Sequence, residues 1–112
     1  MELELDHVAV PSQDIAASVR WYREKLGARV LYQDDTWAFL QIGRGKLALV
    51  TPGQHPPHVA VRVDGATLTV AAQDAGKPVD RHRDGTQGIY ITDPDGNAVE
   101  LICYPAAETV DG

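Results

Sequence analysis

The chain has 112 residues, of which 44% are hydrophobic and 23% are charged, and its formal net charge is −6. This length suits one ordinary domain, and the apolar share is too high for long disorder. The acidic balance offers no electrostatic reason to bind DNA, RNA or an anionic membrane, and no apolar run approaches the ~20 residues that cross a bilayer.

The first half of the chain predicts a strand, a helix and three further strands. A β-rich run over residues 3–10 ends at Pro11 and is typical of a strand. Asp14 can cap a helix through residue 25, where apolar residues recur at spacings of four and three, and Gly27 ends it. The three strands are expected at residues 29–32, 37–42 and 46–51, with turns at 34–35 and 43–45 between them.

The second half predicts the same order of elements. A strand over residues 58–63 is followed by Asp64, which can cap a shorter helix that Gly76 ends. The remaining strands are expected near residues 79–83, 88–92 and 98–104. Residues 54–57 are expected to connect the two halves, and residues 106–112 to form a loose tail.

An internal repeat supports this doubled order. His7-Val8-Ala9-Val10 recurs letter for letter as His58-Val59-Ala60-Val61, at an offset of 51 residues. Residues 45–50 align with 96–101 at the same offset, and 26–30 align with 75–79 at an offset of 49. Two copies are too few for a solenoid. We therefore expect a single α+β domain of two βαβββ modules, over about 1–53 and 58–105.

Two histidines and one glutamate are candidate metal ligands. His7 and His58 hold matching positions of the repeat, and Glu100 lies within an apolar strand, where a carboxylate is costly unless something pairs with it. Two imidazoles and a carboxylate can bind a divalent metal and leave positions open for water and substrate. The alternative is that Glu100 faces solvent and that both histidines are ordinary polar residues at a strand edge.

Other candidates have two interpretations each. Trp37, Phe39 and Gln41 alternate along one predicted strand, so their face of that strand either lines a cavity or packs in the core. Tyr90 either donates a hydrogen bond to a bound oxygen or simply packs. His82 lies between two arginines and is expected at the surface.

Three segments together resemble the vicinal oxygen chelate superfamily. They are Asp6-His7-Val8-Ala9-Val10, then Trp21-Tyr22 with Leu26-Gly27, and finally Asp93-Pro94-Asp95-Gly96-Asn97-Ala98-Val99-Glu100-Leu101. This superfamily holds glyoxalase I, extradiol dioxygenases, fosfomycin-resistance transferases, methylmalonyl-CoA epimerases and bleomycin-binding proteins. The resemblance runs from Leu3 to about Pro105 and implies two βαβββ modules that form a curved mixed sheet around a metal.

The resemblance also implies roles for single residues. Ligands in this superfamily come from the first and fourth strands of each module, which here gives His7, His58 and Glu100 as ligands of Zn, Mn, Ni, Co or Fe(II). The remaining ligand position falls on Leu49 by the 51-residue offset, whereas glyoxalase I and the epimerases have Glu or Gln there. Tyr90 matches a tyrosine of the fosfomycin transferases and is expected to act as a catalytic residue that orients a substrate oxygen.

We therefore expect a metal-dependent enzyme that binds a small oxygen-rich molecule through two of its oxygens. Its reaction class is open between lyase, isomerase, transferase and dioxygenase. The alternative is a non-catalytic small-molecule binding protein of the bleomycin-resistance kind. The resemblance implies a homodimer, and the composition predicts no nucleic-acid or membrane partner. The lone Cys103 and the lack of a secretory signal predict a cytoplasmic location.

Overall fold

A computed structural model of the chain describes residues 3–82 and 84–105. The predicted tail, and Arg83 at the end of a predicted strand, lie outside the described residues. In chain order the elements are β1 (Glu4–Pro11), α1 (Ile15–Leu26), β2 (Arg29–Gln33), β3 (Trp37–Ile42), β4 (Gly45–Val50), β5 (His58–Arg62), α2 (Gly65–Ala75), β6 (Asp80–Arg81), β7 (Gln87–Thr92) and β8 (Ala98–Cys103). The predicted α+β class and the doubled βαβββ order are confirmed. None of the helices described has the length and apolarity to span a membrane.

The chain forms two compact units, and the boundaries between them fall within β1 and within β5. Asp6–Ala60 is one unit, called here the first module. The described parts of Met1–Leu5 and Val61–Gly112 make up the other unit, called here the second module. His7 and His58 therefore belong to the first module, whereas Tyr90 and Glu100 belong to the second.

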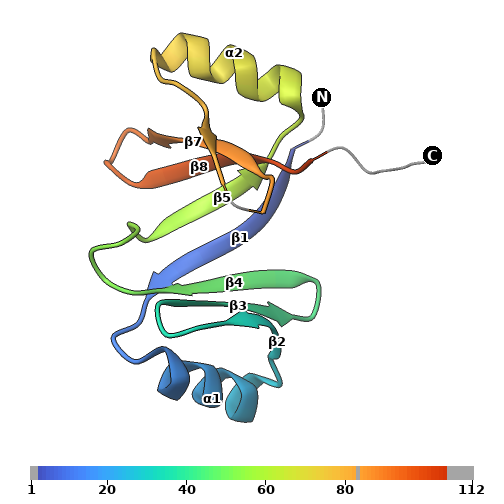
Figure 1. Cartoon of the computed structure of the whole chain (residues 1–112), viewed down its shortest axis with the longest axis vertical. Helices are drawn as coiled ribbons and strands as arrows, with labels where there is room; N and C mark the ends of the chain where they lie inside the picture. The colour runs from blue at the N-terminus through green and yellow to red at the C-terminus, as the bar shows by residue number, and fades with distance from the viewer. Residues whose placement is uncertain (1–2, 83, 106–112) are drawn as a thin grey trace, which may run out of the picture. The chain divides into compact units, whose positions relative to one another are not determined.

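The first module is a mixed four-stranded sheet with α1 packed on one of its faces (Figure 1). Its strand order is β2-β3-β4-β1, in which β1 and β4 run parallel and the other pairs run antiparallel. Asp14 accepts a hydrogen bond from the backbone N–H of Ala17 and so caps α1, as the sequence predicts. The core between helix and sheet is apolar and consists of Ile15, Val19, Ala28, Ala38, Leu40 and Leu49.

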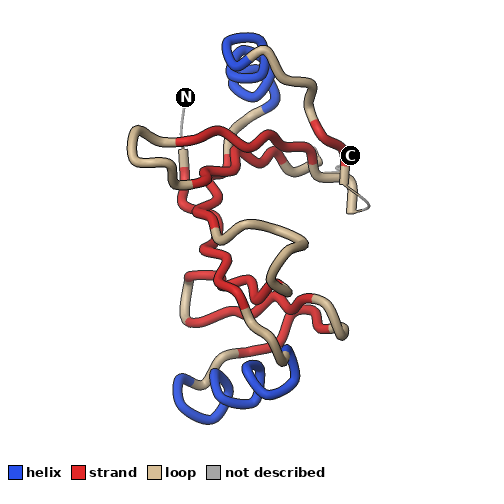
Figure 2. Tube along the Cα trace, turned by 90° about the vertical axis from the view of Figure 1, so that its left-hand side faces the viewer, coloured by secondary structure: helices blue, strands red, loops and turns tan. Residues whose placement is uncertain are grey.

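The second module repeats this plan with the end of β5 (residues 61–62), then β8, β7 and β6, and with helix α2 (Figure 2). Asp64 caps α2 through the backbone N–H of Thr67, and Gly76 ends the helix at a φ of 65°, a conformation that favours glycine. The core under α2 is made of Val63, Leu68, Ala72 and Ile89. The strand predicted at residues 79–83 is shorter than expected, because among the described residues of this range only Asp80–Arg81 pairs with β7.

Candidate metal centre

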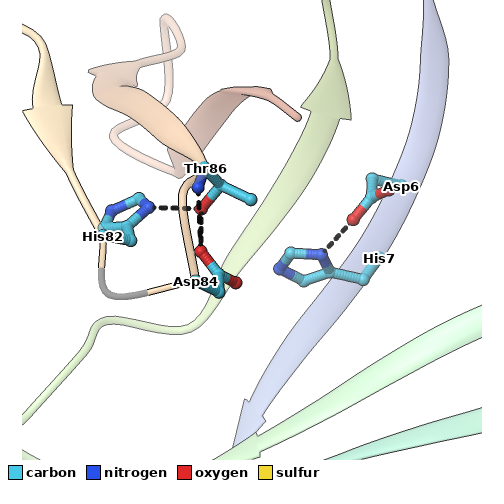
Figure 3. A network of polar contacts seen from close by, with 5 residues as sticks. All are labelled: Asp6, His7, His82, Asp84 and Thr86. Atoms are coloured by element: carbon cyan, nitrogen blue, oxygen red, sulfur yellow. Dashed lines mark hydrogen bonds and ion pairs between the residues drawn. The ribbon is translucent and has the colours of Figure 1, made fainter. Parts of the chain in front are cut away.

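His7 lies on β1, next to a carboxylate that orients its ring. Both side chains are buried, and Nδ1 of His7 lies 2.7 Å from Oδ2 of Asp6 (Figure 3). Since an ionised carboxylate only accepts hydrogen bonds, Nδ1 carries a proton, and the lone pair of the neutral ring is then on Nε2. A histidine that binds a metal commonly has its other nitrogen held by a carboxylate in this way.

His58 is held in the same manner by the backbone. Its Nδ1 donates to the carbonyl oxygen of Pro56 at 2.8 Å, which again assigns the lone pair of the neutral ring to Nε2. The ring centroids of His7 and His58 are 5.5 Å apart, with an angle of 72° between the ring planes. The first module therefore brings two buried imidazoles side by side, each held through Nδ1 so that Nε2 is the nitrogen that can bind a metal.

Glu100 lies on β8 of the second module and is only 5% exposed, so the alternative in which it faces solvent is wrong. A glycine on the neighbouring strand makes room for it. A Cβ atom added at Gly88 would lie 2.8 Å from the carbonyl oxygen of Leu101 and 3.3 Å from Oε2 of Glu100. A glycine inside a strand often marks such a close approach, and this is the sequence signal by which the position could have been noticed.

Tyr90 lies directly opposite Glu100 in the β7–β8 pair and is half-buried. Burial raises the pKa of its phenol, and the negative charges of Glu100 and Asp80 raise this pKa further. The phenol therefore stays protonated at neutral pH and is able to donate a hydrogen bond. Its predicted role toward a substrate oxygen stays a prediction.

The strand register corrects one sequence-based equivalence. Ser12 and Val63 hold the same position in the repeat, at the offset of 51 residues. The N–H of Ser12 donates to the carbonyl of Val50, and the N–H of Val63 donates to the carbonyl of Ile102, so Val50 and Ile102 are equivalent. The residue equivalent to Glu100 is therefore Ala48. The assignment to Leu49 is wrong by one residue, and one residue reverses the face of a strand.

The side chains at these two positions confirm the corrected register. Leu49 is 1% exposed and packs in the core under α1. Ala48 faces away from that helix and packs with Ala9, which shares a strand face with His7. An alanine supplies no ligand, so the conclusion that this position holds no carboxylate is unchanged.

The sequence did not predict a third oriented histidine, His82. His82 is exposed, as expected, but its Nδ1 lies 2.8 Å from Oγ1 of Thr86, which donates in turn to Oδ1 of Asp84 at 2.7 Å (Figure 3). Because the threonine proton is directed to Asp84, its oxygen accepts from Nδ1 of His82. Cε1 of His82 would lie 3.6 Å from a Cβ atom on Gly88. The ring therefore lies on the same side of β7 as Glu100.

Comparison with known proteins identifies the family of the chain. The family model described as Glyoxalase/Bleomycin resistance protein/Dioxygenase superfamily matches residues 4–101. Biphenyl-2,3-diol 1,2-dioxygenase 3 of Rhodococcus globerulus is 28% identical over 116 aligned positions, which cover 87% of this chain and 61% of that protein. The chain thus spans about three fifths of the length of this curated relative.

Solved structures show the same fold at low sequence identity. Methylmalonyl-CoA epimerase from Mycobacterium tuberculosis has a TM-score of 0.73 at 18% identity, and the match covers 91% of this chain and 88% of that one. A hypothetical protein from Bacillus halodurans C-125 also has a TM-score of 0.73, at 17% identity, with 100% of both chains covered.

Proposed function

Since the chain belongs to the Glyoxalase/Bleomycin resistance protein/Dioxygenase superfamily, we propose that it is a metal-dependent enzyme that binds a small oxygen-rich molecule through two of its oxygens. The observation that carries the proposal is the pair of buried imidazoles, His7 and His58, each held through Nδ1. Holding both rings in this way costs conformational freedom, and it is the arrangement that metal-binding histidines use.

In this proposal His7, His58 and Glu100 hold one divalent ion, which is Zn, Mn, Ni, Co or Fe(II). All three side chains are buried, and their nitrogen and oxygen donors form a set suited to these ions. A carboxylate oxygen is a common ligand of such ions, and the buried side chain of Glu100 offers one. When bound, the ion supplies Lewis-acid chemistry toward substrate oxygens.

The chain's own residues set the conditions of the reaction. Asp6 keeps Nε2 of His7 as the basic nitrogen, and Tyr90, protonated at neutral pH, donates a hydrogen bond to a substrate oxygen. Ala48 stands where glyoxalase I and the epimerases are expected to have Glu or Gln, so this position cannot take a proton from substrate. This favours transferase or dioxygenase chemistry over isomerisation, in line with the name of the dioxygenase relative.

Metal binding by matched variants tests the proposal. We expect protein loaded with each of the five ions in turn to bind near one equivalent of at least one of them. Glu100→Gln should weaken that binding by about a hundredfold or more, because a direct ligand is lost. Asp6→Asn should weaken it by about 10- to 100-fold, as is typical when the partner of a ligating histidine is changed.

Glu24→Gln on the exposed surface of α1 is the matched control for Glu100→Gln and should bind metal like the wild-type protein. Isothermal titration and elemental analysis measure metal binding by the wild-type protein and by each variant. No binding of any of the five ions by the wild-type protein would contradict the proposal. The better account would then be the second candidate, a non-catalytic small-molecule binding protein.

The remaining partners are proposals from the sequence and the resemblance. We propose a homodimer, which sedimentation equilibrium tests directly. A small molecule is the proposed substrate, and the net charge of −6 argues against nucleic-acid and membrane partners. The cytoplasmic location stays a prediction.

A further inference from the structure

A row of aromatic rings crosses the first module and ends at His7. The rings of Tyr32 and Trp37 are stacked with centroids 4.6 Å apart, and Phe39 follows at 6.1 Å from Trp37. Phe39 then meets His7 edge to face, with centroids 5.3 Å apart. We call Tyr32, Trp37 and Phe39 the aromatic wall.

The aromatic wall does not belong to the core under α1. Ala38 and Leu40, which alternate with its rings along β3, are fully buried in that core. Phe39 packs instead on the other sheet face, over three small side chains, Ala9, Ala48 and Val50. Tyr32 is 44% exposed, and Trp37 and Phe39 are only half-buried. Phe39 thus packs on a second apolar cluster, outside the core under α1, and both Trp37 and Phe39 keep part of their surface exposed.

The outer end of the wall is held rigidly by one carboxylate. Asp34 accepts hydrogen bonds from the hydroxyl of Tyr32 at 2.5 Å and from the backbone N–H groups of Thr36 and Trp37 at 2.8 and 2.9 Å. These hydrogen bonds hold the pKa of Asp34 well below its usual range, and the bond from Tyr32 contributes most. The carboxylate therefore stays ionised and continues to accept the hydrogen bonds. Rings fixed before a ligand arrives lose little freedom when it binds.

Positive charge accompanies the inner end of the wall. Nζ of Lys46 lies 5.7 Å from the ring centroid of Phe39. Lys46 is opposite Gln41 in the β3–β4 pair, and Gln41 accepts a hydrogen bond from the guanidinium of Arg29 at 2.8 Å. Lys46 thus lies near the inner ring of the wall in a chain of net charge −6, whereas Arg29 contacts Gln41. An anionic group beside Phe39 would gain from the charge of Lys46.

The second module keeps an aromatic ring at only one of the two positions that the wall occupies on β3. By the register given above, Trp37 is equivalent to Gly88 and Phe39 to Tyr90. The same sheet is therefore built with no side chain at the position of Trp37. A tryptophan ring at this position is therefore not needed to build the sheet.

We propose that the aromatic wall binds the planar ring of an anionic aromatic substrate. This inference rests on the proposed function, since the oxygens of that substrate are the ones that reach the metal. The ring lies against Trp37 and Phe39, the negative substituent lies toward Lys46, and the molecule's vicinal oxygens point to His7. Stacking on fixed rings provides affinity, and Lys46 selects for charge.

Three small chelators test the proposal with zinc-loaded and metal-free protein. The probes are 3,4-dihydroxybenzoate, neutral catechol as the same ring without the carboxylate, and tartrate as a chelating acid without a ring. We expect 3,4-dihydroxybenzoate to bind at least about tenfold more tightly than tartrate. Trp37→Leu, which keeps an apolar side chain, should weaken binding of both ring probes by about tenfold and leave zinc and tartrate binding unchanged, and Phe39→Leu should weaken binding of both ring probes by a similar factor. Lys46→Met should abolish the preference for 3,4-dihydroxybenzoate over catechol.

Trp21→Leu is the matched control, because Trp21 is exposed on α1 outside the wall. Equal affinity for ring probes and tartrate would overturn the inference, as would equal losses in Trp21→Leu and Trp37→Leu. The two proposals fail separately. Zinc binding without ring preference overturns only this inference, whereas ring preference in protein that binds none of the five metals overturns only the proposed function.

Discussion

The two modules share one backbone plan and differ on one face of their sheets. Away from the helix, the first module has Phe39 opposite Ala48, and the second has Tyr90 opposite Glu100. Toward the helix, both have leucine at equivalent positions, Leu49 and Leu101. The helix-facing residues therefore maintain the fold in both halves. The opposite face is free to specialise, as an aromatic surface in one module and as a buried carboxylate with a tyrosine in the other.

The largest expected effect tests the helix-facing side of this comparison. Leu49→Ala should lower the free energy of unfolding by about 2–5 kcal/mol, because a fully buried leucine leaves a cavity. Leu101→Ala should cost less, since Leu101 is only partly buried. Chemical denaturation of both variants measures the difference. Equal losses would show that the two cores are packed alike, and a loss of metal binding in Leu49→Ala with the fold intact would contradict its assignment to the helix side.

The next effect concerns the position where one module has tryptophan and the other has glycine. Gly88→Ala should lower the free energy of unfolding by about 1–3 kcal/mol, because the new Cβ meets the backbone oxygen of Leu101 and crowds Glu100. Gly65→Ala is the matched control, since a Cβ there has no heavy atom within 4 Å. Thermal unfolding measures both. A stable Gly88→Ala protein would mean that β7 and β8 lie less close than described.

The smallest effect is the pH dependence of Tyr90. Its pKa in the folded protein is raised above the ordinary value of about 10. A raised folded pKa contributes stability that is present below the unfolded pKa and is lost as the pH rises above it. The wild-type protein should therefore lose more stability than Tyr90→Phe between about pH 9 and about pH 11. Parallel pH profiles would contradict the burial of this phenol.

Much of the fold was predictable because its signals are local. Asp14 and Asp64 cap helices through their own neighbours, and Gly27 and Gly76 end them with a positive φ. The doubled βαβββ order follows from these signals together with the repeat of His7 and His58. The use of His7, His58 and Glu100 as ligands, and the union of both modules in one domain, stay predictions.

The sequence by itself determined most of the elements, the caps of the helices and the types of donor available, because propensity, capping and periodicity act over a few residues. Only the tertiary structure decided that Ala48 and not Leu49 is equivalent to Glu100, because register depends on hydrogen bonds between strands far apart in the chain. It also decided that Asp6 and Pro56 orient the two imidazoles and that Phe39 packs against His7. Such contacts depend on how a side chain is oriented within a pleated sheet, and spacing along the chain does not specify that orientation.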